Sequence, residues 1–357
     1  MSIRSFYKKI LKKKYKIKSP TAAAMLVDDF IMDYKNTKNI IETMYIHSKG
    51  YSVNDWKLSS INKNNYKDYL STAEYYALHP INGKYSSWID DKLTLKNLLQ
   101  GTELSTYMPK YYYHIDESGT LLCLYDSEEK KINPNIEDVI NLLKNKGSLA
   151  IKLLNGSIGE GFYKAEYNQE KFYLNNREYS CTDFSNLIRN LKNYLITEYL
   201  YTNERFSKIN PTTTNTIRFL AGKLAKSEPL TLLKGFIRFG TQISGTVENY
   251  NRGGVLCYYD ENGFFKNGNI MKNGENIVID KHPDTNVDLN GYIPCFDEIK
   301  KCVRLFGEIY PQCTYLGFDF VVTNKDEVKI IEINSLTSLD ACQLDGPWKA
   351  PLCVIKR

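Results

Sequence analysis

Three oxygen-bearing side chains interrupt two apolar runs in the segment GFDFVVTNKDEVKIIEINS, residues 317–335. They are Asp319, Glu332 and Asn334, and they stand where a buried strand would normally carry Val or Ile. A polar turn separates the two runs, which predicts a β-hairpin. Oxygen ligands from Asp, Glu and Asn suit Mg²⁺ or Mn²⁺. The segment therefore indicates either a divalent cation site or a solvated hairpin face whose carboxylates bind nothing.

The register of this hairpin sharpens the choice. With a turn centred on Lys325 and Asp326, residues 322 and 329 are partners, and Asp319 faces Glu332. Asn334 points from the same face as Glu332, because side chains of a strand repeat every second residue. Like charges directly opposite each other destabilise a sheet, and burial adds a desolvation cost. A cation between the two carboxylates would reverse the sign of the interaction.

A second candidate is Lys152, inside the apolar strand SLAIKLL, with the turn NGSIGEG shortly after it. The backbone amides of Ser157, Ile158 and Gly159 in that turn can cradle phosphate oxygens. An unpaired charge in an apolar strand is costly, so Lys152 needs an anionic partner. A triphosphate would satisfy both features; the alternative is a plain glycine hairpin with the lysine in solvent. No Walker motif is present, because no Gly-Lys-Ser/Thr follows the glycines.

The segment TEYLYTNERF supplies a third candidate. Glu198 ends a strand, and the chain through Tyr199 and Leu200 would enter a hinge between two lobes. Free backbone N–H and C=O groups in such a hinge can pair with an adenine edge, and Glu204 downstream could hold ribose hydroxyls. Two surface glutamates are the alternative reading.

Strand arginines form the fourth candidate. Arg218 lies in TNTIRFLAG and Arg238 in GFIRFG, and the run VENYNRGG adds Asn251 and Arg252. Arginines that point into a cleft are good clamps for phosphate or acyl phosphate. Arginines that cap a sheet edge are the alternative, most strongly for Arg252.

The elements that position these residues follow from periodicity. Residues 1–75 are predicted to be mostly helical, and a turn-rich break follows at HPINGKYSSW. A helix starts after Asp90 or Asp91, either of which would be its N-cap, and a further helix ends at Gly147. Strands then dominate from residue 212 onward. The order predicts an α+β lid between larger lobes.

Composition is that of an ordinary soluble globular protein of 357 residues, with 42% hydrophobic and 25% charged residues. No apolar run is long enough to span a bilayer, and the N-terminus lacks a signal-peptide core, so the expected location is the cytoplasm. The eight cysteines form no Cys-x-x-Cys pair, which argues against a zinc site or a disulfide framework.

Charge is uneven along the chain. Residues 1–20 carry eight basic residues and no acid, so removing them from the net charge of +6 leaves about −2. The body is therefore not expected to bind nucleic acid. Apolar residues at helical spacing predict a basic amphipathic helix in residues 1–20. It would lie either on the inner face of an anionic membrane or on the protein's own body.

The ordered series of these signals resembles the ATP-grasp superfamily over roughly residues 88–345. WIDDKLTLKNLL, MPKYYY and the Asn-Thr-Ile-Arg stretch carry a narrower likeness to ATP-grasp proteins associated with sugar transfer and teichuronopeptide synthesis. The resemblance implies two α+β subdomains that grip Mg-ATP, with Lys92 and Lys152 on the phosphates and Ser157 to Gly159 as the phosphate loop. It implies Glu198 to Leu200 at the adenine, Glu204 at the ribose, and Asp319, Glu332 and Asn334 as metal ligands. Arg218, Arg238 and Asn251 would steady phosphates and substrate.

The resemblance implies an ATP-dependent carboxylate–amine ligase that works through an acyl phosphate. The substrates would be a small-molecule or glycan-linked carboxylate and an amine, in capsule, O-antigen or cell-wall assembly. A phosphotransferase of the same fold and a non-catalytic ATP-binding scaffold are the alternatives. No feature of the sequence indicates an oligomeric state. The expected regions are a helical part at 1–75, a pre-ATP-grasp part at 76–130, a lid at 131–200 and a large subdomain at 201–357. Ser335 to Ser338 stand where D-alanine–D-alanine ligases have Pro-Gly, so the acceptor loop is not readable by analogy.

Overall fold

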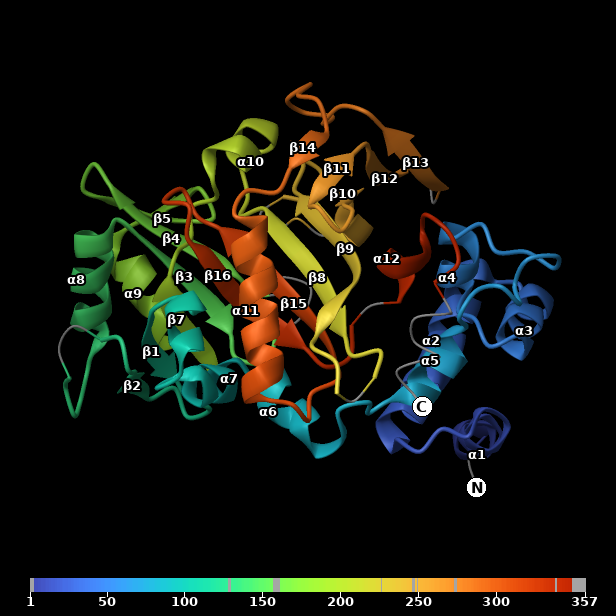
Figure 1. The fold of residues 1–357 in the computed structure, drawn as a ribbon. Helices are drawn as coiled ribbons and strands as arrows, with labels where there is room; N and C mark the ends of the chain where they lie inside the picture. The colour runs from blue at the N-terminus through green and yellow to red at the C-terminus, as the bar shows by residue number, and fades with distance from the viewer. Residues whose placement is uncertain are drawn as a thin grey trace.

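Two large antiparallel sheets, a small two-stranded sheet of β11 and β14, and a group of N-terminal helices make up the described part of the molecule (Figure 1). The computed structural model describes residues 3–127, 130–156, 161–225, 227–245, 248, 250–272, 275–337 and 339–348. Among these residues the fold is mixed helix and strand, with two α+β subdomains behind a helical N-terminal region, which confirms the predicted fold class.

The first sheet has the strand order β2-β1-β7-β3-β4-β5-β6. Helices α8 and α9 pack on it, and their apolar residues form one core with its strands. Helix α8 ends at Gly147, whose φ of 75° is the left-handed C-cap that the sequence predicted. The bounds are β1 Tyr111–Ile115, β2 Leu121–Cys123, α8 Ile136–Lys146, β3 Ser148–Leu153, β4 Tyr163–Asn168, β5 Lys171–Leu174, β6 Arg177–Tyr179, α9 Cys181–Arg189 and β7 Tyr194–Glu198.

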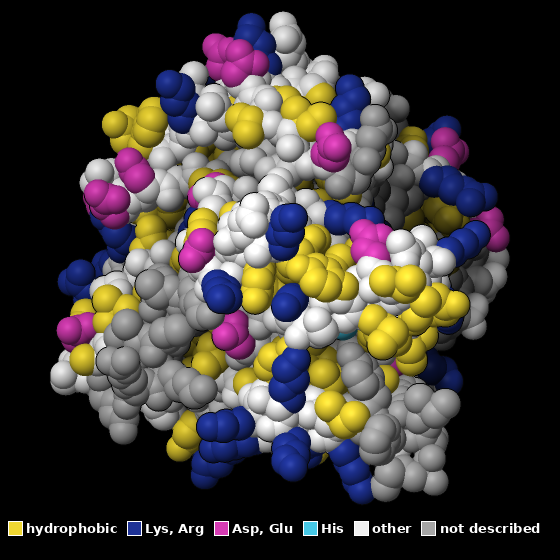
Figure 2. Space-filling model, turned by 90° about the vertical axis from the view of Figure 1, so that its right-hand side faces the viewer, with side chains coloured by type: hydrophobic (Ala, Val, Ile, Leu, Met, Phe, Trp, Pro, Cys, Tyr) yellow, Lys and Arg dark blue, Asp and Glu magenta, His cyan; other side chains and the backbone are white. Residues whose placement is uncertain are grey.

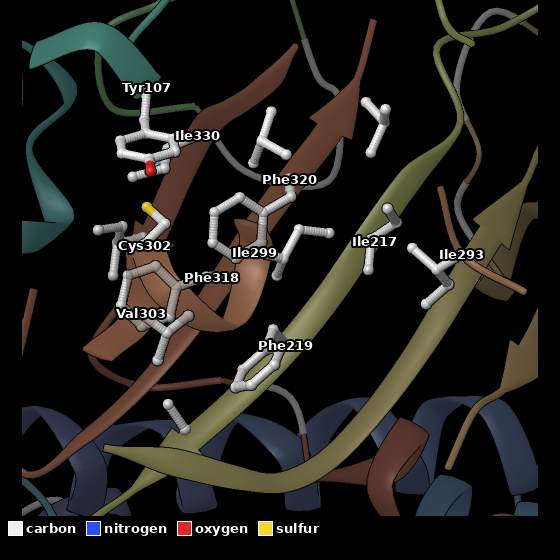
Figure 3. Packing of buried hydrophobic residues seen from close by; sticks show 14 of the residues in the cluster. Tyr107, Ile217, Phe219, Ile293, Ile299, Cys302, Val303, Phe318, Phe320 and Ile330 are labelled. Atoms are coloured by element: carbon white, nitrogen blue, oxygen red, sulfur yellow. The ribbon is translucent and has the colours of Figure 1, made fainter. Parts of the chain in front are cut away.

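The second sheet has the order β13-β12-β10-β9-β8-β15-β16 and carries α11 on one face. Figure 3 shows this core, in which Phe318 and Phe320 of β15 stack at 5.6 Å beneath α11. The bounds are α10 Glu204–Ile209, β8 Thr216–Gly222, β9 Thr231–Phe239, η3 Tyr250–Arg252, β10 Val255–Tyr258, β11 Phe264–Lys266, β12 Gly268–Lys272, β13 Glu275–Ile279, β14 Asn290–Tyr292, α11 Phe296–Ile309, β15 Tyr315–Val322, β16 Val328–Asn334 and α12 Asp340–Gln343.

The N-terminal helices lie at one end of the molecule, beside the second sheet (Figure 1). The Tyr75 hydroxyl donates to the Thr337 carbonyl oxygen at 2.7 Å, and the Gln343 side chain makes two hydrogen bonds to the backbone of Leu70. These contacts fix the helices to the segment that follows β16. The bounds are α1 Ile3–Tyr15, α2 Pro20–Thr37, α3 Ile40–Ser48, α4 Val53–Leu58 and α5 Thr72–Leu78.

Residues 76–130 do not form a unit of their own. Strands β1 and β2 belong to the first sheet, because β1 pairs with β7 as well as with β2. The preceding helices instead contribute Leu95 and Leu99 to the core of the second sheet. The break expected at HPINGKYSSW contains short helices, and Asp91 is the N-cap of α7. The bounds are η1 Gly83–Tyr85, α6 Ser86–Asp90, α7 Lys92–Leu99 and η2 Glu103–Tyr107.

Candidate active site

A cavity of about 490 Å³ lies between the two sheets. Both sheets, the start of α7 and the connection after β7 contribute to its wall. Ten of the residues proposed from sequence line it: Lys92, Lys152, Glu198, Tyr199, Leu200, Arg218, Arg238, Asp319, Glu332 and Asn334. Segments far apart in the sequence therefore bring these side chains to one place.

The hairpin of β15 and β16 forms the floor, and Asp319 is the register partner of Glu332 as predicted. The turn and the pairs beside it differ from the prediction. The turn has three residues, because the Thr323 N–H donates to the Glu327 carbonyl oxygen, so 322 pairs with 328 and not with 329. Asp326 takes the left-handed conformation that such a turn requires (φ 60°).

A β-bulge restores the register. Asp319 pairs with Glu332 and Phe320 with Ile330, so Ile331 has no partner on β15. In a regular strand Ile331 and Glu332 would point to opposite faces, but both line the cavity here. The bulge thus adds an apolar wall beside the carboxylate.

Asp319 is held by two arginines from neighbouring strands. The Arg218 Nε and Nη2 atoms donate to its two carboxylate oxygens at 2.5 and 2.9 Å, and Arg238 Nη2 donates to Oδ1 at 2.8 Å. Burial alone would raise the pKa of the Asp319 carboxyl. The two arginines outweigh that effect and hold its pKa below the usual value. The sequence had predicted the arginines as phosphate clamps and Asp319 as a metal ligand, and did not predict that they bind each other.

Glu248 and Thr216 extend this network. Thr216 Oγ1 accepts from Arg238 Nε at 2.9 Å and donates to Glu248 Oε1 at 2.9 Å. Burial raises the pKa of Glu248. Both residues line the cavity, and sequence reasoning missed both. Thr216 lies two residues before Arg218 on β8, so the face repeat of a strand was the signal that could have found it.

Lysines lie on the opposite wall. Lys92 is buried, and its Nζ donates to the Gly156 carbonyl oxygen at 3.1 Å and lies 3.5 Å from Glu332 Oε1. Lys152 Nζ lies 5.2 Å from the centre of the Tyr111 ring. Burial, helped by the charge of Lys92, lowers the pKa of Lys152 to about 7. Two cations with one nearby carboxylate favour an anionic ligand in this part of the cavity.

The side chain of Tyr111 lies beside Lys152. Tyr111 is buried, and its hydroxyl has no hydrogen-bond partner among the described residues. Glu332 lies close enough to raise the pKa of Tyr111 further, after burial has already raised it. A buried hydroxyl without a partner is costly, but Tyr111 is not among the residues that line the cavity.

The connection after β7 forms another part of the wall. The Glu198 carboxylate accepts from the Lys110 backbone N–H at 3.2 Å. Lys164, which sequence reasoning missed, stacks its ammonium 4.9 Å from the Tyr199 ring centre. Leu200 is buried. Glu204 is not among the lining residues; it starts α10 and forms an exposed ion pair with Lys208 at 2.9 Å.

Of the remaining candidates, one is placed apart from this wall and three lie outside the described residues. Asn251 lies in η3, is exposed, and is not among the lining residues. Ser157, Ile158 and Gly159 lie outside the described residues, although Gly156 just before them lines the cavity. The roles of these residues and of Glu204, like those of the ten that line the cavity, stay predictions.

The described part of the chain holds no group of three or more His, Cys, Asp and Glu side chains arranged to bind a metal. Asp319 and Glu332 are two carboxylates, and the third proposed ligand, Asn334, is an amide. Within the same part of the chain, every helix is too short or too polar to cross a membrane.

A family model described as "Sugar-transfer associated ATP-grasp" matches residues 71–348. Among solved structures, the chain is similar to the ATP-grasp ligase PsnB in complex with a minimal precursor (13% identity, TM-score 0.40, 77% of this chain and 62% of that one). It is also similar to a RiPP-associated ATP-grasp ligase from Chryseobacterium gregarium (9%, 0.40, 76% and 59%). An L-amino acid ligase from Bacillus licheniformis is a third (7%, 0.39, 76% and 48%). The chain spans about half to two thirds of the length of these structures. A comparison with curated proteins gave no match.

Proposed function

Since the chain belongs to the sugar-transfer associated ATP-grasp family, as its sequence predicted, and ATP-grasp family members are ligases that form carbon–nitrogen bonds, we propose that it joins a carboxylate to an amine with conversion of ATP to ADP and phosphate. One observation carries the proposal. A single cavity between the sheets places two lysines opposite the hairpin that bears Glu332 and Asn334. Phosphate chemistry needs both features in one cavity.

The residues present fit a nucleotide. Lys92 and Lys152, which both line the cavity, would hold phosphate oxygens. The backbone from Glu198 to Leu200 would pair with the base, beside the apolar wall that Ile331 provides. Binding of a polyanion would also relieve the mutual repulsion of the two lysines.

The residues also fit a hard divalent cation in part. Glu332 and Asn334 offer carboxylate and amide oxygens, which Mg²⁺ prefers. Asp319 already accepts three hydrogen bonds from arginine, so it could offer at most its remaining lone pair. When bound, Mg²⁺ would neutralise charge on the phosphates. We assign Glu332 and Asn334 as its main protein ligands.

The proposed reaction has two steps. A carboxylate oxygen of the substrate attacks the γ-phosphorus of ATP, the bond to the β-phosphate oxygen breaks, and ADP leaves. The amine nitrogen then attacks the acyl carbon, phosphate leaves with the bonding pair, and the amine gives up a proton to solvent or phosphate. Arg238 lies between Asp319 and Glu248, where it can stabilise the acyl phosphate. Neither step needs a protein nucleophile.

The carboxylate substrate would come from glycan assembly, as the family's link to sugar transfer suggests. A sugar acid, or an amino acid joined to a sugar, has the required carboxylate. Capsule, O-antigen and cell-wall polymers are the classes that contain such units. The amine would be a second small molecule or glycan unit.

The test is ADP release from Mg-ATP with a panel of sugar acids and amino acids, each with and without an amine. Glu332→Gln is the variant, and Glu327→Gln, an exposed carboxylate at the tip of the same hairpin, is the matched control. We expect ADP only when acid and amine are both present, and a loss of at least about 100-fold in the variant. ADP formed without any amine would replace the ligase with a phosphotransferase. Nucleotide binding without turnover on the whole panel would favour a scaffold.

A further inference from the structure

Apolar side chains gather on the outer side of the N-terminal helices α2 and α3. Ile41 is 79% exposed and Met44 is 59% exposed, and both lie on one face of α3 with Ile40 and Tyr45. Figure 2 shows hydrophobic side chains gathered on this side of the molecule, with Lys and Arg beside them. Single exposed apolar residues are ordinary, but a group of this size marks an interaction surface. We call it the α2–α3 apolar surface; its members are Ile31, Met32, Tyr34, Ile40, Ile41, Met44 and Tyr45.

Positive charge is concentrated in the same part of the chain. Residues 1–50 contain Arg4 and ten lysines against three aspartates and one glutamate, which gives 11 − 4 = +7. The whole chain carries +6, so residues 51–357 sum to −1. The binding preference that this charge creates is therefore local to the N-terminal helices.

The basic helix α1 borders the α2–α3 apolar surface. The Lys14 ammonium donates to the carbonyl oxygen of Ser48, the last residue of α3, at 2.6 Å. Lys49, which follows α3, lies 5.5 Å from the Tyr45 ring centre. Lys35 and Lys38 are exposed at the end of α2. Lysines thus surround apolar side chains on more than one side.

Leu11, one residue of the apolar stripe of helix α1, packs on the protein's own body. Leu11 is buried against α2 and α5, in a core with Ala22, Ala23 and Leu26. Of its stripe, Ile10 is exposed, and the side chains of Phe6 and Tyr7 lie outside the described residues. The sequence offered a membrane and the protein's own body as alternatives for this helix. The contacts of Leu11 favour the second at that position, and exposed lysines of α1 supply positive charge.

We propose that the α2–α3 apolar surface, with the lysines of α1, docks on an anionic lipid bilayer. Ile41 and Met44 would enter the boundary between headgroups and acyl chains, and the lysines would bind lipid phosphates. A second copy of the chain fits this face poorly, because two regions of charge +7 would be brought together. The inference does not depend on the proposed ligase activity.

Docking would hold the candidate active site at the membrane. The contacts of Tyr75 with Thr337 and of Gln343 with Leu70 fix the N-terminal helices to the segment that follows β16 of the second sheet. The cavity would therefore stay at a set position relative to the bilayer, where lipid-linked glycans are found.

The test is co-sedimentation of the full chain with phosphatidylcholine vesicles and with vesicles of equal parts phosphatidylcholine and phosphatidylglycerol. We expect binding to the anionic vesicles that weakens in high salt. Ile41→Ser with Met44→Ser should lower the partition coefficient about tenfold. Ile132→Ser with Ile243→Ser, at positions 95% and 80% exposed elsewhere, is the matched control and should change nothing.

Charge is tested separately. Lys9→Gln, Lys13→Gln and Lys16→Gln together should also reduce binding about tenfold. The same change at the exposed Lys110, Lys192 and Lys266 should not. The proposal is overturned if the chain ignores anionic vesicles at low salt, or if both apolar pairs behave alike. It is also overturned if Ile41→Ser with Met44→Ser converts a dimer into a monomer in sedimentation velocity, which would make the surface a self-interface.

Discussion

The guanidinium of Arg218 binds the carboxylate of Asp319 through two hydrogen bonds, Nε to Oδ1 at 2.5 Å and Nη2 to Oδ2 at 2.9 Å. The two residues are register partners on adjacent strands, β8 and β15, and both side chains are largely buried. Arg238 adds a second cation to the same carboxylate. The floor of the cavity therefore carries an ion cluster of one carboxylate and two guanidinium groups.

We expect Asp319→Asn to lower the free energy of unfolding by about 3 kcal/mol, because it removes the counter-charge of the largely buried Arg218 and leaves Arg238 with Glu248 alone. Adding Arg218→Gln should recover part of that loss. Urea unfolding at neutral pH measures both, and Glu327→Gln at the hairpin tip should stay within about 0.5 kcal/mol of the parent. Since the folded pKa of Asp319 is depressed, the difference between Asp319→Asn and the parent should shrink as the pH falls below the unfolded value of about 3.9. An unfolding free energy unchanged by Asp319→Asn would contradict the ion cluster.

Lys152 should take up a proton when nucleotide binds. Its pKa of about 7 in the free protein means that most of it is neutral at pH 8, and phosphate oxygens would raise that pKa. At a pH between the pKa of Lys152 in the free protein and its pKa in the complex, the complex holds a proton that the free protein lacks. At a pH below both pKa values, Lys152 is protonated in both states. Calorimetry of ADP binding in buffers of different ionisation enthalpy should show uptake of about one proton at pH 8 and little at pH 6.

Lys152→Arg is the control for this effect. Arginine stays charged throughout, so binding should persist while the uptake at pH 8 disappears. Equal uptake in parent and variant would assign the proton to another group.

Two tyrosines should respond oppositely to loss of the hydroxyl. Tyr111→Phe removes a buried hydroxyl that has no partner among the described residues, so we expect an increase in stability of up to about 1 kcal/mol. Tyr75→Phe removes the donor to Thr337 O and leaves that carbonyl short of a partner, at a cost of about 1–2 kcal/mol. Thermal unfolding without nucleotide compares the pair. Destabilisation of both variants to the same extent would show that Tyr111 has a partner in the free protein.

A methyl group at Gly317 should disturb the edge of the cavity. A Cβ there would lie 2.3 Å from Thr337 Cγ2, closer than any real contact, so Gly317→Ala should cost about 1–3 kcal/mol. Thr337→Ser removes that methyl and keeps the hydroxyl that bonds with Tyr315. The double variant should recover much of the loss in urea unfolding. Failure of the second substitution to help would locate the strain at Arg218 or Leu220, whose atoms lie 3.3 Å away.

Sequence reasoning succeeded where the deciding interactions are local. The strands and the helix ended by Gly147 follow from periodicity and cap chemistry within a few residues. The pairing of Asp319 with Glu332 was also predicted correctly, but through two errors that cancel. The turn is one residue longer than expected, and the bulge at Ile331 shifts the register back.

What sequence reasoning missed depends on long-range pairing. Arg218 and Arg238 bind Asp319 because β8 lies between β15 and β9, an order that the sequence of β8 does not reveal. The same applies to β1, which pairs with β7 at a sequence separation of 194 − 115 = 79 between Ile115 and Tyr194, and to β2, which pairs with β1. Glu248 gave no signal at all, since only the fold brings it beside Thr216.

The bulge at Ile331 also determines what a deletion in this hairpin would change. Losing Ile331 would turn the bulge into a regular ladder, in which Asp319 still faces Glu332 and Phe320 still faces Ile330. The cavity would then lack its apolar wall while the fold survived. Homologues with a shortened hairpin would therefore keep the architecture and differ in what the cavity can hold.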